Sequence, residues 1–184
     1  VVRLMGCTHP TALSADFPIC PGEKNMRPMS VPIINIPGLS LRHIELSDAS
    51  AWYEYLAHPS VVEHTSWNLS EQEDLTSLIA RYQSADPATA MRFVLQEDSN
   101  GLLLGTIGFH TVSPTNRSAE IAYDIHPAFC GRGLATICCK TMVDWAFSAQ
   151  GLVRIQATVM DTNLASIRVL EKSGFLLEEK LKRY

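Results

Sequence analysis

The stretch of sequence that decides the fold reads Ile125-His126-Pro127-Ala128-Phe129-Cys130-Gly131-Arg132-Gly133-Leu134-Ala135-Thr136. A strand pattern ends at its start, a loop of small residues follows, and a helical pattern begins at its end. The unpaired N–H groups and the dipole of a helix N-terminus favour an anion. Gly131 and Gly133 let the backbone approach an oxyanion closely, and Arg132 adds a positive charge. The segment fits a bound pyrophosphate, and it equally fits a tight turn with no ligand.

Strand and helix patterns surround this segment on both sides. Apolar alternation predicts strands at residues 41–44, 91–96, 102–110, 119–125 and 153–159 and a last strand from 175. Helical spacing and start signals predict helices at residues 47–58, 70–82, 134–151 and 163–173, the second opened by a capping box at Ser70 and Glu73. Gly105 and Gly108 indicate a bulge or a close backbone approach. The order predicts an α/β fold with a mixed, mostly antiparallel central sheet flanked by helices.

Composition limits the classes of function. The 184 residues are 46% hydrophobic and 18% charged, as in a globular protein of one domain. A net charge of −4 argues against nucleic acid as a partner, and no stretch approaches the ~18 apolar residues of a membrane helix. The five cysteines form no CxxC pair, so we expect free thiols in a reducing cytoplasm. The histidines lack metal-binding spacing, so no metal is expected.

Residues 1–38 differ from the rest of the chain. Most of the ten prolines lie there, and no strand or helix period is evident. We therefore expect 1–38 to be a poorly ordered N-terminal extension, of which about the first 30 residues are dispensable for folding. The domain proper is expected to span 39–184.

Three motifs in order resemble the GNAT superfamily of N-acetyltransferases over about residues 39–184. Cys130-Gly131-Arg132-Gly133-Leu134-Ala135 is similar to the acetyl-CoA pyrophosphate loop, Q/R-x-x-G-x-G/A, except that Cys130 replaces Gln or Arg. The segment from Asp161 to Phe175 resembles the N-x-x-S/A…K-x-G-F helix of the family. Glu120-Ile121-Ala122-Tyr123 is similar to the E-I-G-Y phrase of the ribosomal-protein N-terminal (Rim-type) acetyltransferase branch.

The resemblance implies acetyl-CoA as co-substrate and direct attack by an amine, with no cysteine nucleophile. It places the pyrophosphate on Cys130, Gly131, Arg132, Gly133, Leu134, Ala135 and Thr136. It places the pantetheine arm along the main chain of Tyr123, Asp124 and Ile125, with Asn163 as a further contact. The N–H near Ile125 would polarise the thioester carbonyl, and Ser166 would hydrogen-bond the departing thiolate. The resemblance thus implies Ser166 and Ile125 as catalytic residues, and Glu120 is added as a candidate base that could relay the proton.

Several of these residues also have a purely structural interpretation. Asn163 precedes a helix and suits its N-cap. Glu120 and Asp124 share one face of a strand, where a solvated or salt-bridged edge competes with a catalytic base. Cys130 is either a thiol with a lowered pKa near a helix N-terminus or a small loop residue. Side chains that form either the core or the wall of an acceptor cleft are Trp52, Tyr55, Trp67 and Tyr82.

We predict an enzyme that moves an acetyl group from acetyl-CoA to a primary amine, with a protein or peptide N-terminal α-amine as acceptor. The alternatives are a non-catalytic acyl-CoA binding module and acetylation of a polyamine, an aminoglycoside or another small amine. Relatives usually continue beyond the position of Tyr184 with another strand. Its lack here suggests either a truncated sequence or a partner chain that supplies the sheet edge, so a homodimer is among the expected partners.

Overall fold

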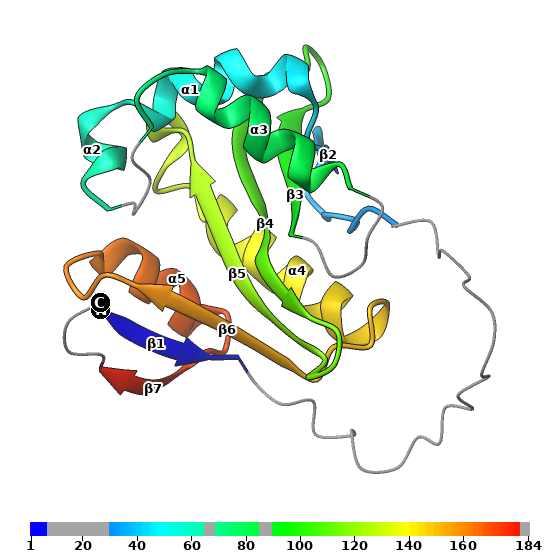
Figure 1. The fold of residues 1–184 in the computed structure, drawn as a ribbon, viewed down its shortest axis with the longest axis vertical. Helices are drawn as coiled ribbons and strands as arrows, with labels where there is room; N and C mark the ends of the chain where they lie inside the picture. The colour runs from blue at the N-terminus through cyan, green and yellow to red at the C-terminus, as the bar shows by residue number, and fades with distance from the viewer. Residues whose placement is uncertain (7–29, 65–68, 85–89, 181–184) are drawn as a thin grey trace.

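A mixed sheet forms the centre of the computed structural model, which describes residues 1–6, 30–64, 69–84 and 90–180 (Figure 1). In spatial order its strands are β2 (Leu39–His43), β3 (Met91–Glu97), β4 (Leu103–Ser113), β5 (Ser118–Ile125), β6 (Arg154–Val159), β1 (Val2–Met5) and β7 (Leu176–Lys180). Neighbouring strands are antiparallel except for β5 and β6, which are parallel. The predicted mixed, mostly antiparallel sheet is confirmed.

Helices cover both faces of the sheet. One face carries α1 (Ala49–Leu56) and α3 (Glu73–Tyr82), and the other carries α4 (Leu134–Ser148) and α5 (Leu164–Lys172) (Figure 1). Short helical turns complete the described elements: η1 (Leu46–Asp48), α2 (Pro59–Val62) and η2 (Pro127–Phe129). Among the described residues, no helix combines the length and apolar character needed to span a bilayer. We refer below to the α1–α3 face and the α4–α5 face.

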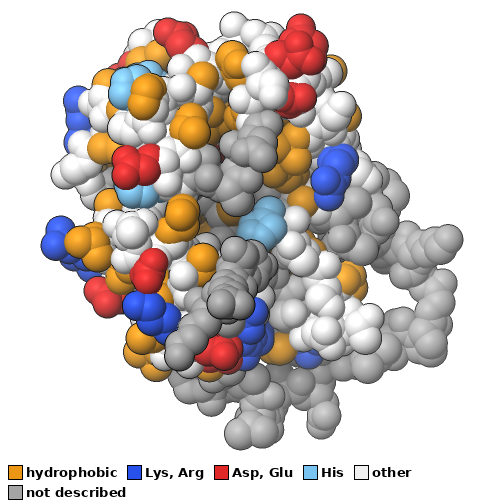
Figure 2. Space-filling model, turned by 60° about the vertical axis from the view of Figure 1, so that its left-hand side comes forward, with side chains coloured by type: hydrophobic (Ala, Val, Ile, Leu, Met, Phe, Trp, Pro, Cys, Tyr) orange, Lys and Arg blue, Asp and Glu red, His pale blue; other side chains and the backbone are white. Residues whose placement is uncertain are grey.

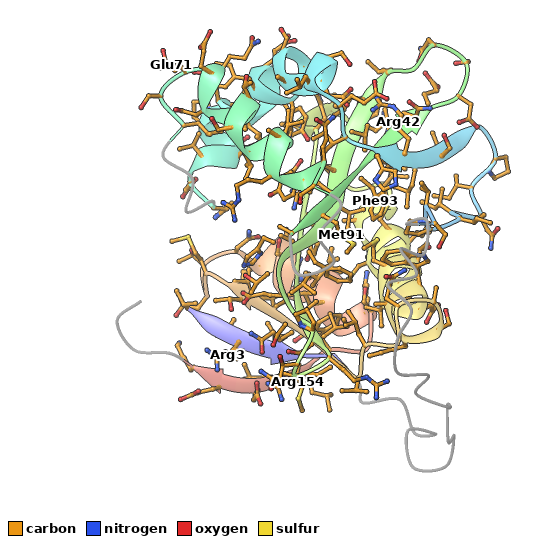
Figure 3. All side chains as sticks on the ribbon, turned by 45° about the vertical axis from the view of Figure 1, so that its right-hand side comes forward. Arg3, Arg42, Glu71, Met91, Phe93 and Arg154 are labelled. Atoms are coloured by element: carbon orange, nitrogen blue, oxygen red, sulfur yellow. The ribbon has the colours of Figure 1, made fainter. Side chains whose placement is uncertain are left out.

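Each face of the sheet has its own apolar core. On the α4–α5 face, Phe93 of β3, labelled in Figure 3, packs edge-to-face against Trp145 of α4 with ring centroids 5.7 Å apart. On the α1–α3 face, Trp52 and Ile79 are fully buried with Val94. These two cores hold the helix ends and the central strands in fixed relative positions, which is what a preorganised site requires.

The central strands form the predicted antiparallel meander, β3–β4–β5. A Cβ at Gly108 would lie 2.0 Å from the carbonyl oxygen of Met91, and one at Gly105 would lie 2.5 Å from that of Asp124. Any larger residue would therefore push neighbouring backbone away, which confirms the predicted close approach. The β3–β4 register also shifts between Leu95 and Gln96.

The predicted capping box at Ser70 and Glu73 is wrong. Helix α3 begins at Glu73, its N-cap is Gln72, and no side chain caps it. Instead, the Asp74 carboxylate accepts the N–H groups of Ser70 and Glu71, at 2.8 and 3.2 Å. Asp74, one residue beyond the predicted Glu73, is thus the acidic side chain that accepts N–H groups before the helix. The sequence did contain a capping carboxylate, but the prediction assigned it to the wrong residue.

The N-terminal residues contradict the expected extension where the structure describes them. Val2–Met5 form β1, which lies between β6 and β7 and pairs with both. Val2 and Leu4 are buried in the core on the α4–α5 face, as is Ile34. Residues 7–29 lie outside the described part, so the prediction for them stays untested. Four residues contain too little pattern to reveal a strand whose partners lie more than a hundred residues away.

Candidate active site

The loop before α4 has the geometry of an open anion cradle. Gly131 and Gly133 both have φ of +77°, in the left-handed region that favours glycine. Gly133 is the N-cap of α4, and no side chain caps this helix. A Cβ added at either glycine would meet no atom within 4 Å. The first-turn N–H groups, from Leu134 to Thr136, have no partner within the helix and lie at the positive end of the helix dipole, beside two glycines with no side chain to cover them.

Arg132 and Cys130 flank this loop. The Arg132 guanidinium lies 5.0 Å from the centre of the Phe129 ring and donates to the Ala128 carbonyl at 3.3 Å, which holds its charge at the rim. The Cys130 thiol lies 3.7 Å from the carbonyl oxygen of Ile125. Burial raises the pKa of Cys130, so the interpretation as an activated thiol is not supported.

Strands β5 and β6 separate close to this cradle. They pair only from Ser118/Arg154 to Glu120/Gln156, although β5 continues to Ile125 and β6 to Val159. Figure 1 shows the two strands diverging beyond this point. We call this diverging region the fork.

The edge of β5 that faces the fork carries unused backbone groups. The His126 N–H donates to the Leu104 carbonyl of β4 at 2.9 Å. Because backbone groups alternate in direction along an antiparallel strand, those of Tyr123 and Ile125 point away from β4, into the fork. These are two of the residues that sequence reasoning assigned to the pantetheine arm, whereas the backbone of Asp124 faces β4.

Helix α5 starts on the other side of the fork. Asn163 is its N-cap, and the side-chain oxygen of Asn163 accepts the Ser166 N–H at 3.0 Å. The structural interpretation of Asn163 is therefore confirmed. The Tyr123 hydroxyl donates to the Ser166 carbonyl at 3.2 Å, so β5 and α5 are tied together across the fork. A role for Ser166 toward a thiolate stays a prediction.

Asp124 takes part in a buried network on the α1–α3 face that sequence reasoning missed. Its carboxylate pairs with Arg92 and also accepts from Thr106 at 2.8 Å, from Trp52 at 3.2 Å and from the Tyr55 hydroxyl. Arg92 is only 2% exposed and also donates to the Ala122 carbonyl. Asp124 is thus a salt-bridged residue, as its structural interpretation required. The sequence feature that could have predicted this network is Arg92, a single charged residue within the apolar strand pattern at 91–96.

The aromatic residues of α1 belong to this network. Trp52 and Tyr55 are buried, which confirms them as core residues. Both side chains donate to the Asp124 carboxylate of β5, so both lie against the central strands. Burial and the Asp124 charge raise the pKa of Tyr55 well above its usual value, so its hydroxyl stays protonated and acts as a donor. Tyr82 is also buried, and Trp67 lies outside the described residues.

Glu120 lies where the fork begins, also on the α1–α3 face. One carboxylate oxygen accepts from Gln156 of β6 at 3.3 Å, and the other lies 3.7 Å from Nε2 of His110 on β4. The Glu120 side chain is 16% exposed, so it is accessible but partly shielded. His110 was not among the predicted site residues. Within the described residues, no cluster of three or more His, Cys, Asp or Glu side chains could hold a metal ion.

Comparison with known proteins agrees with this geometry. A family model described as an acetyltransferase (GNAT) domain matches residues 39–176. YoaA of Bacillus subtilis, named an uncharacterized N-acetyltransferase, is 34% identical over 155 residues, covering 83% of this chain and 88% of YoaA. The chain therefore belongs to the GNAT acetyltransferase family.

Two solved structures show the same fold. A spermidine N-acetyltransferase from Vibrio cholerae, in complex with CoA and spermine, aligns with a TM-score of 0.70 at 23% identity, covering 78% of this chain and 84% of that one. The ribosomal-protein-S5-alanine acetyltransferase from Vibrio fischeri aligns with a TM-score of 0.68 at 20% identity, covering 77% and 81%. The protein is an acetyl-CoA-dependent N-acetyltransferase that acts on an amine. Its similarities extend to more than one branch, so they do not single out the Rim-type branch.

Proposed function

We propose that acetyl-CoA binds in the fork with its pyrophosphate on the α4 N-terminus. The observation that carries this assignment is the uncapped first turn of α4 behind two glycines with positive φ. The pantetheine arm then runs along the fork edge of β5, where Tyr123 and Ile125 present backbone groups. Asn163 and Ser166 lie on the opposite side of the same fork, which suits a thioester held between β5 and α5.

Acetyl transfer then needs few protein groups. A neutral amine attacks the thioester carbon, and the N–H near Ile125 stabilises the negative charge that develops on the carbonyl oxygen. The C–S bond breaks, and the departing thiolate is hydrogen-bonded by the Ser166 hydroxyl as it takes up a proton. Bond formation needs no covalent intermediate, which agrees with a Cys130 thiol that burial keeps protonated.

For the acceptor we propose the α-amine of a protein or peptide N-terminus. An α-amine has a pKa of about 7.7–8.0 against about 10.4 for lysine, so a useful fraction is neutral near pH 7. On the α1–α3 face of the central strands, the Asp124 charge is already paired with Arg92, which leaves Glu120 as the carboxylate available to an amine. One carboxylate suits one amino group better than a polyamine with several positive charges.

A polyamine or another small amine is the second candidate. The net charge of −4 favours a cationic acceptor, and one of the similar folds is a spermidine acetyltransferase. On the side of the molecule seen in Figure 2, however, acidic and basic side chains are interspersed wherever the described surface is visible. Neither sign forms a continuous patch there.

The acceptor assignment is tested by comparing kcat/KM, over a range of pH, for three acceptors. These are a peptide with a free N-terminus, the same peptide blocked at its N-terminus but carrying lysine, and spermidine. We expect the free N-terminal peptide to be the best substrate near neutrality. A higher kcat/KM for the blocked lysine peptide or for spermidine would contradict the α-amine assignment.

The remaining proposals concern the setting of the enzyme. Cys130, Cys138 and Cys139 are free thiols, which fits a reducing compartment, and we propose the cytoplasm. We also propose that the protein forms a homodimer, which sedimentation analysis tests directly.

A further inference from the structure

The acetyl-transfer reaction releases a proton from the amine nitrogen, and the fork offers two carboxylates that could receive it. Both oxygens of Asp124 are already used by Arg92, Thr106, Trp52 and Tyr55. A proton arriving at Asp124 would have to displace one of these donors. Within the part of the chain that the structure describes, Glu120 accepts a hydrogen bond from Gln156 alone, at a long 3.3 Å, and its other oxygen lies 3.7 Å from His110.

A β-bulge brings His110 to this position. The β4–β5 register pairs Phe109 with Ile121 and then Thr111 with Glu120, so His110 is the extra residue. Such bulges redirect a side chain relative to the regular strand, and they occur often beside active sites. Here the redirected imidazole lies over Glu120, at the residue where β5 and β6 cease to pair.

We propose that His110 is a positioning residue that acts with Glu120 as a proton-accepting pair for the attacking amine. The inference rests on the proposed function, because it assigns a role within the same fork. Glu120 takes the proton from the amine nitrogen as the C–N bond forms. The proton then passes to Nε2 of His110 and from there to solvent, while the CoA thiolate released on C–S cleavage takes a separate proton from water through the Ser166 hydroxyl.

The surroundings of His110 suit this role. The 3.7 Å separation from Glu120 lies within ion-pair range, and catalytic contacts that are long without substrate tighten in the substrate complex, so we expect this contact to shorten to a hydrogen bond before the proton passes. The His110 side chain is 43% exposed, which gives the proton a route to solvent. Burial lowers the pKa of His110, Glu120 opposes that shift, and Arg92 adds to it, so the imidazole is neutral and able to accept near pH 7.

The first test is a pair of variants, Glu120→Gln and His110→Gln, with the double variant and with His43→Gln as the histidine control. His43 lies on β2 beside Phe93, away from the fork. All are assayed with whichever amine the wild type acetylates fastest. We expect His110→Gln to lower kcat about tenfold, less than the ~10²-fold or more of a direct acid–base group, with an unchanged KM for acetyl-CoA.

The pH profile separates this role from a structural one. Wild-type kcat should rise with pH through the pKa of His110, because only neutral imidazole accepts a proton, and that limb should vanish in His110→Gln. The double variant should be no slower than Glu120→Gln, since the two residues act as one unit. The proposal would be overturned if the losses of kcat in the two single variants multiply in the double variant. It would also be overturned if His110→Gln keeps the wild-type dependence of kcat on pH.

A second readout does not depend on turnover. The His110 imidazole is titrated by NMR in the wild type and in Glu120→Gln, and loss of the carboxylate should lower the pKa of His110 further. An unchanged pKa would show that the pair does not exist. A preference for a polyamine would contradict the α-amine assignment but leave the pair intact, so the two failures are distinguishable.

Discussion

At the scale of single residues, Ser166 has the most specific predicted role. It lies in the first turn of α5, where its N–H is held by Asn163 and its carbonyl by Tyr123. These two bonds use only its backbone, so they fix the position of the residue without occupying the hydroxyl. A hydroxyl held in this way costs little reorganisation when a thiolate forms beside it.

We therefore expect Ser166→Ala to lower kcat by about 10²-fold while the KM for acetyl-CoA changes little, because the proposed bond strengthens only as the thiolate develops. Steady-state kinetics at saturating acceptor measure both constants. Ser173→Ala, at the other end of α5, is the matched control and should keep the wild-type kcat. Wild-type turnover in Ser166→Ala would assign the proton to water.

Single residues are predictable from the sequence where the signal is local. Asn163 as an N-cap and the close approach at Gly108 both follow from one residue type in a recognisable position. Arg92 and His110 were missed because their partners, Asp124 and Glu120, lie on a neighbouring or more distant strand. A register shift of one residue decides which side chains face each other, and a single sequence does not reveal it.

At the scale of elements, the N-terminus of α4 carries the cofactor assignment. Gly133→Glu would place bulk and negative charge beside the first-turn N–H groups. We expect it to abolish acetyl-CoA binding in calorimetric titrations.

Gly133→Asn is the control for backbone strain, since asparagine tolerates the left-handed conformation that Gly133 adopts. It should retain most of the affinity. Near-wild-type affinity in a folded Gly133→Glu variant would place the pyrophosphate elsewhere.

Element boundaries followed the sequence where periodicity was long. The meander strands and α4 were predicted closely, because each repeats its apolar pattern over several turns or residue pairs. The start of α3 was assigned incorrectly because Ser70, Glu73 and Asp74 all offer side chains that can cap. Only the backbone geometry decides which of them reaches the free N–H groups.

At the scale of the whole molecule, β1 changes the expected domain boundary. It occupies an internal position between β6 and β7, so the outer part of the sheet depends on residues from the start of the chain. Leu4 is 2% exposed in the core beneath it. The N-terminal residues, which the sequence pattern predicts to be dispensable, therefore include a structural strand.

Leu4→Ala should destabilise the fold by about 2–5 kcal/mol, the usual cost of truncating a buried leucine. For a domain of this size that corresponds to a fall in Tm of about 5–15 °C. Deletion of residues 1–6 should lower Tm at least as much, whereas Met5→Ala, at a less buried position of the same strand, should have a smaller effect. An unchanged Tm after the deletion would show that β1 does not belong to the sheet.

The central claim is that this chain transfers the acetyl group of acetyl-CoA to an amine. The most direct measurement follows free CoA thiol and acetylated amine together, in a reaction with a mixture of N-terminal peptide, blocked lysine peptide and spermidine. We predict that the two products appear in equal amounts, that neither forms without an amine, and that both vanish in Gly133→Glu. Tight acetyl-CoA binding without acetylated amine, or thiol release without it, would contradict the claim.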